Sequence, residues 1–359
     1  MKKLILIILT VWAALVLLTG CGGQAKRPEP QAAPKEKPLR VVATVFPIFD
    51  WTREILGEGS RAELTLLLDR GVDLHSYQPS AQDIMKISTC DVFIYVGGES
   101  DAWVKDALRE AVNKDMVVVN LMDVLGSRAK TEEHREGMET EHHHDHDAHA
   151  DRDVHDAHGH KHEAHEHKHD GHGHGHEAKA PERDEHVWMS LRNAALFTDA
   201  IAEALTKADA QNAERYAKNA AAYKEKLAAL DADYTKATEA APRKTLLFGD
   251  RFPFRYLVDD YGLTYYAAFP GCSAETEASF ETIAFLAGKL DELRLPVILV
   301  TESRSHKIAE AIVQNTASPD RKILVLDSMQ SETLKASAEG NTYLSVMRKN
   351  LEVLKEALR

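Results

Sequence analysis

Fifteen of the nineteen histidines of this chain fall within residues 141–176. Carboxylates are interspersed among them, and the segment has almost no large apolar side chain. Neutral imidazole is the commonest protein ligand for zinc, copper and nickel. A run this polar cannot bury a core, so we predict a disordered, solvated segment that binds several metal ions loosely. The histidines of this accessory metal loop are His142, His143, His144, His146, His149, His155, His158, His160, His162, His165, His167, His169, His172, His174 and His176.

Four other side chains have the chemistry and the position to form a single, defined metal site. His75 follows the second expected strand, and His186 lies just before a helix that Ser190 would cap. Glu302 and Asp327 each follow a later strand directly. Taken singly, a histidine in such a place is more often an ordinary surface residue, and a carboxylate at a strand end caps the next helix about as often as it binds a ligand. Because ligands of open α/β sheets bind at the carboxyl ends of strands, we interpret the four together as metal ligands between two lobes.

The pattern from Leu39 onward indicates the fold that positions them. Short β-branched runs alternate with helical periodicity, which is typical of βαβ units and a mostly parallel sheet. We predict an α/β fold of two similar lobes, each a mostly parallel four-stranded sheet flanked by helices. The expected strands are 40–46, 62–68, 91–96, 116–121, 245–248, 264–269, 297–301 and 323–326. The expected helices are 48–56, 80–87, 101–112, 190–206, 210–240, 253–261, 280–293, 307–314 and 343–358.

One of these helices is long enough to connect the lobes. Residues 210–240 are rich in Ala, Lys and Glu and contain no Gly or Pro. A helix of this length would span roughly 46 Å at 1.5 Å per residue, which suits a rigid rod joining two lobes. The expected division is an N-terminal lobe at 39–206 that includes the disordered insert 132–181, a bridging helix at 207–241, and a C-terminal lobe at 242–359.

The N-terminus indicates export. Lys2 and Lys3 precede an apolar run over residues 4–18 and then small residues, the zones of a secretory signal. The run is too short to predict a membrane-spanning helix. Leu18-Thr19-Gly20-Cys21 resembles the bacterial lipoprotein cleavage box, which implies a signal peptide at 1–20 and lipid attachment to Cys21. Residues 21–38 then read as a Pro- and charge-rich flexible tether, so we expect a protein held by its lipid on the extracytoplasmic face of a membrane, at the cell surface or in a periplasm.

Composition argues against several other classes. The formal net charge is −13, and no basic stripe interleaved with aromatic residues points to nucleic acid. The sequence has no HExxH helix, no Ser/His/Asp order and no Gly-rich phosphate loop, which disfavours the alternative of a surface zinc metalloenzyme with Glu185 or Glu302 as its base. An adhesin or a metal-storage protein would not need two lobes. Cys90 and Cys272 are isolated in the sequence and are expected to be free thiols, although an oxidising compartment permits a bridge.

Several short motifs follow one another in an order that is known from one protein family. They are Val45-Phe46-Pro47-Ile48, Gly71-Val72-Asp73-Leu74-His75, Tyr77-Gln78-Pro79-Ser80, 91–98 followed by Trp103, Glu185-His186-Val187-Trp188, Thr301-Glu302 and Leu326-Asp327. Outside the insert, residues 39–359 therefore resemble the substrate-binding lipoproteins of bacterial zinc and manganese ABC transporters, the ZnuA/TroA-like group. The resemblance implies two α/β lobes joined by one rigid helix, with a single metal ion between them.

The resemblance also implies ligands. It places the first ligand on His75, the second on His186 and the fourth on Asp327, but the third position holds Arg251. A guanidinium is permanently protonated and cannot bind a cation. The third ligand is therefore left open among Asp250, Glu302, Cys272, a water molecule and a histidine of the insert.

The predicted function follows from this ligand set. Two imidazoles with carboxylate oxygen suit Zn²⁺, whereas Mn²⁺ prefers more oxygen ligands, so we favour zinc, with manganese as the alternative and nickel or iron behind. We expect a monomer, not an enzyme, that captures Zn²⁺ and delivers it to an ABC permease and its ATPase subunit. Because histidine must be neutral to bind, affinity should fall on acidification through an imidazole pKa near 6.5.

Overall fold

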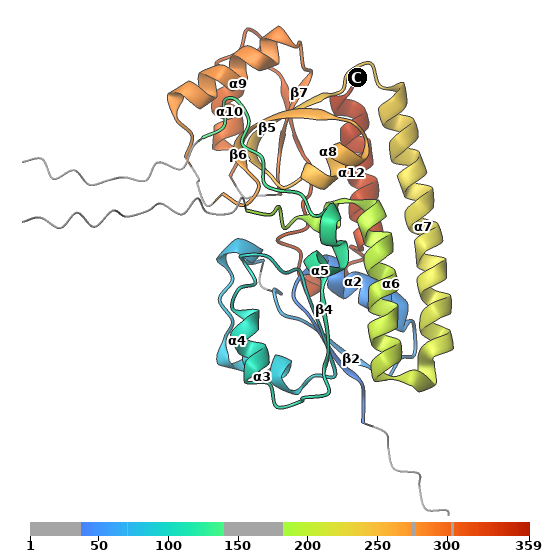
Figure 1. Cartoon of the computed structure of the whole chain (residues 1–359). Helices are drawn as coiled ribbons and strands as arrows, with labels where there is room; N and C mark the ends of the chain where they lie inside the picture. The colour runs from blue at the N-terminus through green and yellow to red at the C-terminus, as the bar shows by residue number, and fades with distance from the viewer. Residues whose placement is uncertain (1–36, 70, 140–181, 274–276, 303–304) are drawn as a thin grey trace, which may run out of the picture. The chain divides into compact units, whose positions relative to one another are not determined.

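The computed structural model describes residues 37–69, 71–139, 182–273, 277–302 and 305–359 (Figure 1). The predicted signal peptide, the lipid attachment at Cys21, nearly all of the tether and the fifteen histidines of the accessory loop lie outside the described residues. Residues 38–359 form one compact unit. Within the described chain, no helix is both long and apolar enough to cross a membrane.

Two four-stranded parallel sheets form the centre of the unit, which confirms the predicted α/β fold. The first sheet has the order β2-β1-β3-β4 and the second the order β6-β5-β7-β8, so the two lobes share one topology. The buried strands carry continuous apolar runs because helices cover both faces of a parallel sheet. The strands are β1 (Arg40–Ala43), β2 (Glu63–Leu66), β3 (Val92–Tyr95), β4 (Val117–Asn120), β5 (Thr245–Phe252), β6 (Thr264–Pro270), β7 (Val297–Val300) and β8 (Lys322–Val325).

The helices occupy the predicted segments, with two short additions. Ser190 caps α6 as expected, because its side chain accepts the backbone N–H of Asn193. The additions, α5 and α11, have five residues each and are too short for a periodic pattern. The α-helices are α2 (Phe46–Leu56), α3 (Ala81–Thr89), α4 (Val104–Arg109), α5 (Leu121–Leu125), α6 (Leu191–Ala208), α7 (Ala213–Ala240), α8 (Arg255–Asp260), α9 (Phe280–Glu292), α10 (Lys307–Gln314), α11 (Leu334–Ala338) and α12 (Tyr343–Ala357).

The long helix α7 contacts elements of both lobes. It packs against α2 and α6 of the first lobe and against the C-terminal helix α12 (Figure 1). Its buried face includes Tyr216, Tyr223, Leu227 and Tyr234, which recur at helical spacing. The Tyr234 hydroxyl donates to the backbone carbonyl of Met347 on α12 at 2.6 Å. The helix therefore shares one hydrophobic core with the elements on either side of it.

A second connection between the lobes is the segment 129–139, which precedes the histidine-rich region. The backbone N–H of Glu139 donates to the carbonyl of Ala268 on β6 at 2.9 Å. Thr131 forms an antiparallel bridge with Arg183, which lies in the segment that returns from the histidine-rich region. Residues 132–139 of this segment were expected in a disordered insert of the first lobe, but they lie along β6 of the second.

Candidate metal centre

His75 is fixed by a short turn that follows β2. The 3-10 helix Leu74–Ser76 starts at Asp73, whose side chain accepts the backbone N–H of His75 at 3.0 Å. The His75 Nδ1 atom lies 2.8 Å from the Ser100 hydroxyl and 3.6 Å from Oε2 of Glu185. Because these contacts engage Nδ1, the other ring nitrogen, Nε2, is the atom turned toward a ligand.

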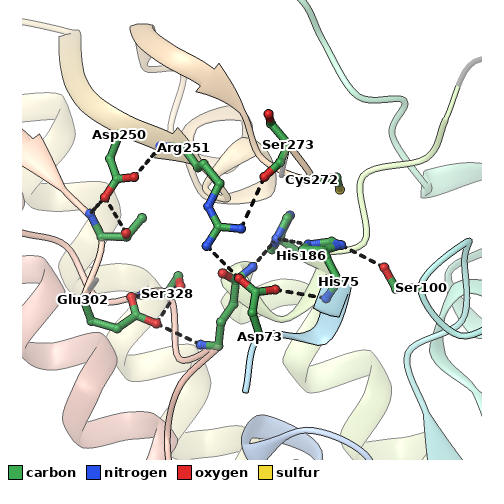
Figure 2. A network of polar contacts seen from close by, with 12 residues as sticks. Asp73, His75, Ser100, His186, Asp250, Arg251, Cys272, Ser273, Glu302 and Ser328 are labelled. Carbon is green, nitrogen blue, oxygen red and sulfur yellow. Dashed lines mark hydrogen bonds and ion pairs between the residues drawn. The ribbon is translucent and has the colours of Figure 1, made fainter. Parts of the chain in front are cut away.

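His186 is fully buried and is held in a similar way. Its backbone N–H and its Nδ1 both donate to the same oxygen of Asp184, at 2.9 and 3.0 Å. Its Nε2 atom lies 3.2 Å from the Nε2 atom of His75 (Figure 2). The same atom also contacts the side-chain amide of Gln330. The structure therefore brings together the two histidines that the sequence placed 111 residues apart.

The two imidazoles have the geometry of a metal-binding pair. Two nitrogens bound to one tetrahedral zinc at about 2.0–2.1 Å stand roughly 3.3 Å apart, close to the observed 3.2 Å. A carboxylate or hydroxyl on the second ring nitrogen is the usual support of a metal-binding histidine, because it fixes the tautomer and the ring orientation. Asp184 and Ser100 supply that support here.

The pKa values of the pair move in opposite directions. Burial and then the neighbouring His186 lower the pKa of His75 to about 4. Burial acts to lower the pKa of His186, but the charge and the hydrogen bond of Asp184 outweigh it, so this pKa is raised above 6.5. Below the His186 pKa the pair therefore carries an extra proton, which His186 holds and which a metal ion would have to displace.

A cysteine completes the one group of metal-capable side chains that the described part of the chain contains. One ligand atom each from His75, His186 and Cys272 lies within 4.8 Å of the other two. Cys272 and His75 also line a cavity of about 240 Å³, together with Glu99, Ser100, Glu182, Arg183 and Glu185. Burial, reinforced by the charge of Glu132, raises the pKa of the Cys272 thiol.

The two predicted carboxylates lie together but outside this group. Glu302 accepts the backbone N–H groups of Ser328 at 2.8 Å and of Gln330 at 3.0 Å, so it holds the loop after β8. Asp327 accepts the N–H of Met329 at 2.8 Å. Burial and then the charge of Glu302 raise the pKa of Asp327 to about 7. The contact from this loop to His186 is made by Gln330 and by neither carboxylate.

Arg251 and Asp250 at the end of β5 are both engaged elsewhere. The Arg251 guanidinium donates to Asp73 at 2.6 Å and to the carbonyl of Ser273 at 3.4 Å (Figure 2). Burial would raise the pKa of Asp73, but Arg251 and then His75 lower it below its ordinary value. Asp250 accepts the hydroxyl of Thr301 at 2.6 Å. The guanidinium therefore forms an ion pair between the lobes, with the carboxylate two residues before His75.

Two supporting residues had a sequence signal that was not used. Asp73 and Asp184 each stand two residues before a site histidine, and each accepts the backbone N–H of that histidine. The repeated Asp-X-His spacing could therefore have identified both. Ser100 and Gln330 had no such signal, because each meets its histidine only through the tertiary fold.

The comparison with known families decides where this chain belongs. The model of the ZnuA family, described as the periplasmic component A of a zinc-uptake complex, matches residues 41–357. The chain belongs to this family. Relatives include the zinc-binding protein AdcA of Streptococcus pyogenes serotype M3, 30% identical over 324 residues that cover 89% of this chain and 56% of AdcA. ZnuA of Bacillus subtilis, a high-affinity zinc uptake system protein, is 27% identical over 346 residues, 96% of this chain and 95% of its own length.

A solved structure of the ZnuA family has the same fold. The Zn(II)-bound ZnuA-like domain of Streptococcus pneumoniae AdcA superposes with a TM-score of 0.64 and 25% identity, over 90% of this chain and 99% of that domain. The present chain thus spans little more than half of the AdcA proteins, and it corresponds to their ZnuA-like domain.

Proposed function

We propose that this ZnuA-family chain captures Zn²⁺ between its two lobes and delivers it to a membrane permease, without chemistry on the ion. The observation that carries the proposal is the pair of Nε2 atoms of His75 and His186, 3.2 Å apart, each with its Nδ1 atom anchored. The relatives support it, because AdcA is named a zinc-binding protein and its ZnuA-like domain is described as Zn(II)-bound.

The proposed site includes Glu302 and Asp327 as its acidic side. Asp327 has a pKa near 7 because it is buried beside Glu302, and a nearby cation would relieve this repulsion. Their oxygens already accept backbone N–H groups, so in this proposal their first contribution is negative charge. The imidazoles favour zinc, while manganese, the alternative, prefers sites richer in oxygen.

The remaining parts of the proposal concern location and partners. A relative from Streptococcus pneumoniae is named a zinc-binding lipoprotein. We propose that Cys21 carries a lipid that holds the protein on the extracytoplasmic face of the membrane, and that an ABC permease with its ATPase subunit receives the ion. The histidines of residues 141–176 are proposed to collect zinc at modest affinity for the central site.

The test separates the central site from the histidine-rich run. After deletion of residues 141–176, calorimetry should still find one tight zinc per chain. His75→Ala in that background should abolish the tight phase, whereas His134→Ala, which removes an exposed histidine of the segment 129–139, should not. Loss of all tight binding on deletion alone would move the site into the run and end the proposal.

A further inference from the structure

We infer that the Cys272 thiolate is the third zinc ligand, in a His-His-Cys site. The inference rests on the proposed function and names the ligand that the family position, held by Arg251, does not supply. It starts from the grouping of His75, His186 and Cys272, whose ligand atoms all lie within 4.8 Å of one another.

The distances allow one ion to bind all three side chains. A tetrahedral zinc holds nitrogen at about 2.0–2.1 Å and sulfur at about 2.3 Å, so its nitrogen and sulfur ligands stand roughly 3.6 Å apart. A separation of 4.8 Å or less therefore needs the Cys272 side chain to move by at most about 1.2 Å. A fourth position remains for water or for the carboxylate of Asp327.

The backbone around Cys272 brings its loop against His186. A Cβ atom on Gly271 would lie 2.8 Å from the carbonyl of Phe252 and 3.1 Å from the ring of His186. Only glycine allows the backbone to come this close to His186 without displacing its neighbours. The next residue, Cys272, carries the thiol. The Cys272 backbone N–H donates to Glu132 at 2.7 Å, which fixes the loop from the other side.

The competing candidates for the third position are less available. Both oxygens of Asp250 accept hydrogen bonds, from Arg251 and Thr301, and both oxygens of Glu302 accept hydrogen bonds from the loop after β8. Arg251 itself points to Asp73 (Figure 2). The thiol lines the same cavity as His75, so an ion that enters the cavity reaches both side chains.

A thiolate ligand has two chemical consequences. The Cys272 S–H bond breaks as the zinc–sulfur bond forms, and its proton leaves to solvent, in addition to the proton displaced from the imidazole pair. Thiolate is a soft ligand that suits zinc and disfavours manganese, so the cysteine would make this site more selective for zinc than a site with only imidazole and carboxylate ligands.

The experiment uses the full reduced chain and one equivalent of Co²⁺ as a spectroscopic substitute for zinc. We expect a thiolate-to-cobalt charge-transfer band in the near ultraviolet, which the histidine-rich run cannot produce. Cys272→Ser should abolish the band and weaken zinc binding about 100-fold. Cys90→Ser is the matched control, because Cys90 is buried in the first lobe and its thiol contacts the Ile87 carbonyl.

The possible results separate this inference from the proposed function. A cobalt complex that requires His75 and His186 but shows no charge-transfer band overturns the cysteine ligand and leaves the proposed function intact. A band that persists in Cys272→Ser also overturns it. Cobalt binding that requires neither histidine overturns both. Should Cys272→Ser fail to fold, the band of the unmodified chain and its loss in His186→Ala still decide.

Discussion

The histidine side and the carboxylate side of the central site differ in how their ligand atoms are used. On the histidine side, the supporting bonds from Ser100 and Asp184 engage only Nδ1, so both Nε2 atoms face one point. On the carboxylate side, Glu302 and Asp327 stand at strand ends as well, yet both accept backbone N–H groups of the loop after β8. Position at the end of a strand therefore does not by itself leave a donor atom free, because hydrogen bonds within the protein can already engage it.

The largest predicted effect on zinc affinity comes from removing an imidazole. His186→Ala should weaken zinc binding about 1000-fold, or about 4 kcal/mol, because it removes a ligand and leaves Asp184 without its ring partner. Calorimetry on the chain without residues 141–176 measures it. The control is His134→Ala, and a loss below tenfold for His186→Ala would remove the distinction between the two sides.

The next effect concerns the support of the ligand. Asp184→Asn should keep the shape of the site but weaken zinc binding about 10- to 100-fold, since the partner of a metal-binding histidine tunes its basicity and orientation. Competition with a zinc chelator gives the affinity. Asp199→Asn, an exposed carboxylate on α6, is the matched control and should leave the affinity unchanged.

The proton of the imidazole pair predicts the pH dependence. Because the pKa of His186 is raised and that of His75 is lowered to about 4, zinc displaces one imidazole proton at a pH between these two values. In Cys272→Ser, where no thiol proton contributes, affinity should fall about tenfold per pH unit once the pH is below the His186 pKa, which lies above 6.5. Zinc affinity would be measured between about pH 5 and 8. A release of two protons per zinc over this range would contradict the prediction.

A smaller effect is expected on the carboxylate side. Glu302→Gln should reduce zinc affinity less than tenfold, but it should lower the free energy of unfolding by about 1–3 kcal/mol, because it weakens charged bonds to Ser328 and Gln330. Thermal melts and calorimetry on one sample measure both. An affinity loss as large as that of His186→Ala would instead make Glu302 a direct ligand.

The smallest predicted effect has the opposite sign. Arg251→Gln should tighten zinc binding by less than about tenfold, because it removes a permanent positive charge that also lowers the pKa of His75. The gain should shrink at high salt if screening reaches the site. A marked loss of affinity would show instead that the ion pair with Asp73 is needed to position His75.

The sequence predicted the sheets and the histidines for physical reasons that do not extend to the rest. All eight strands follow from short β-branched runs and the long helix from a stretch rich in Ala, Lys and Glu without Gly or Pro, and His75 was identified from its place in the turn after β2. The contact between His186 and Gln330 depends on how two distant loops pack, and no local pattern records it. The path of the segment 129–139 along β6 was missed for the same reason. The role of Arg251 became clear only when its partner, Asp73, was found in the other lobe.

The segment 129–139 has a mechanical consequence. Together with α7 and α12, it connects the first lobe to the second at separate places, through a backbone hydrogen bond to Ala268 on β6 and through helix packing. Contacts at several separate places resist rotation of the lobes about any single hinge. A wide opening of the lobes would have to break all of these contacts together. Under the proposed function, an ion would then enter and leave through movement of the short loops that carry Cys272 and Gln330, and the rate of release would depend on loop motion and not on separation of the lobes.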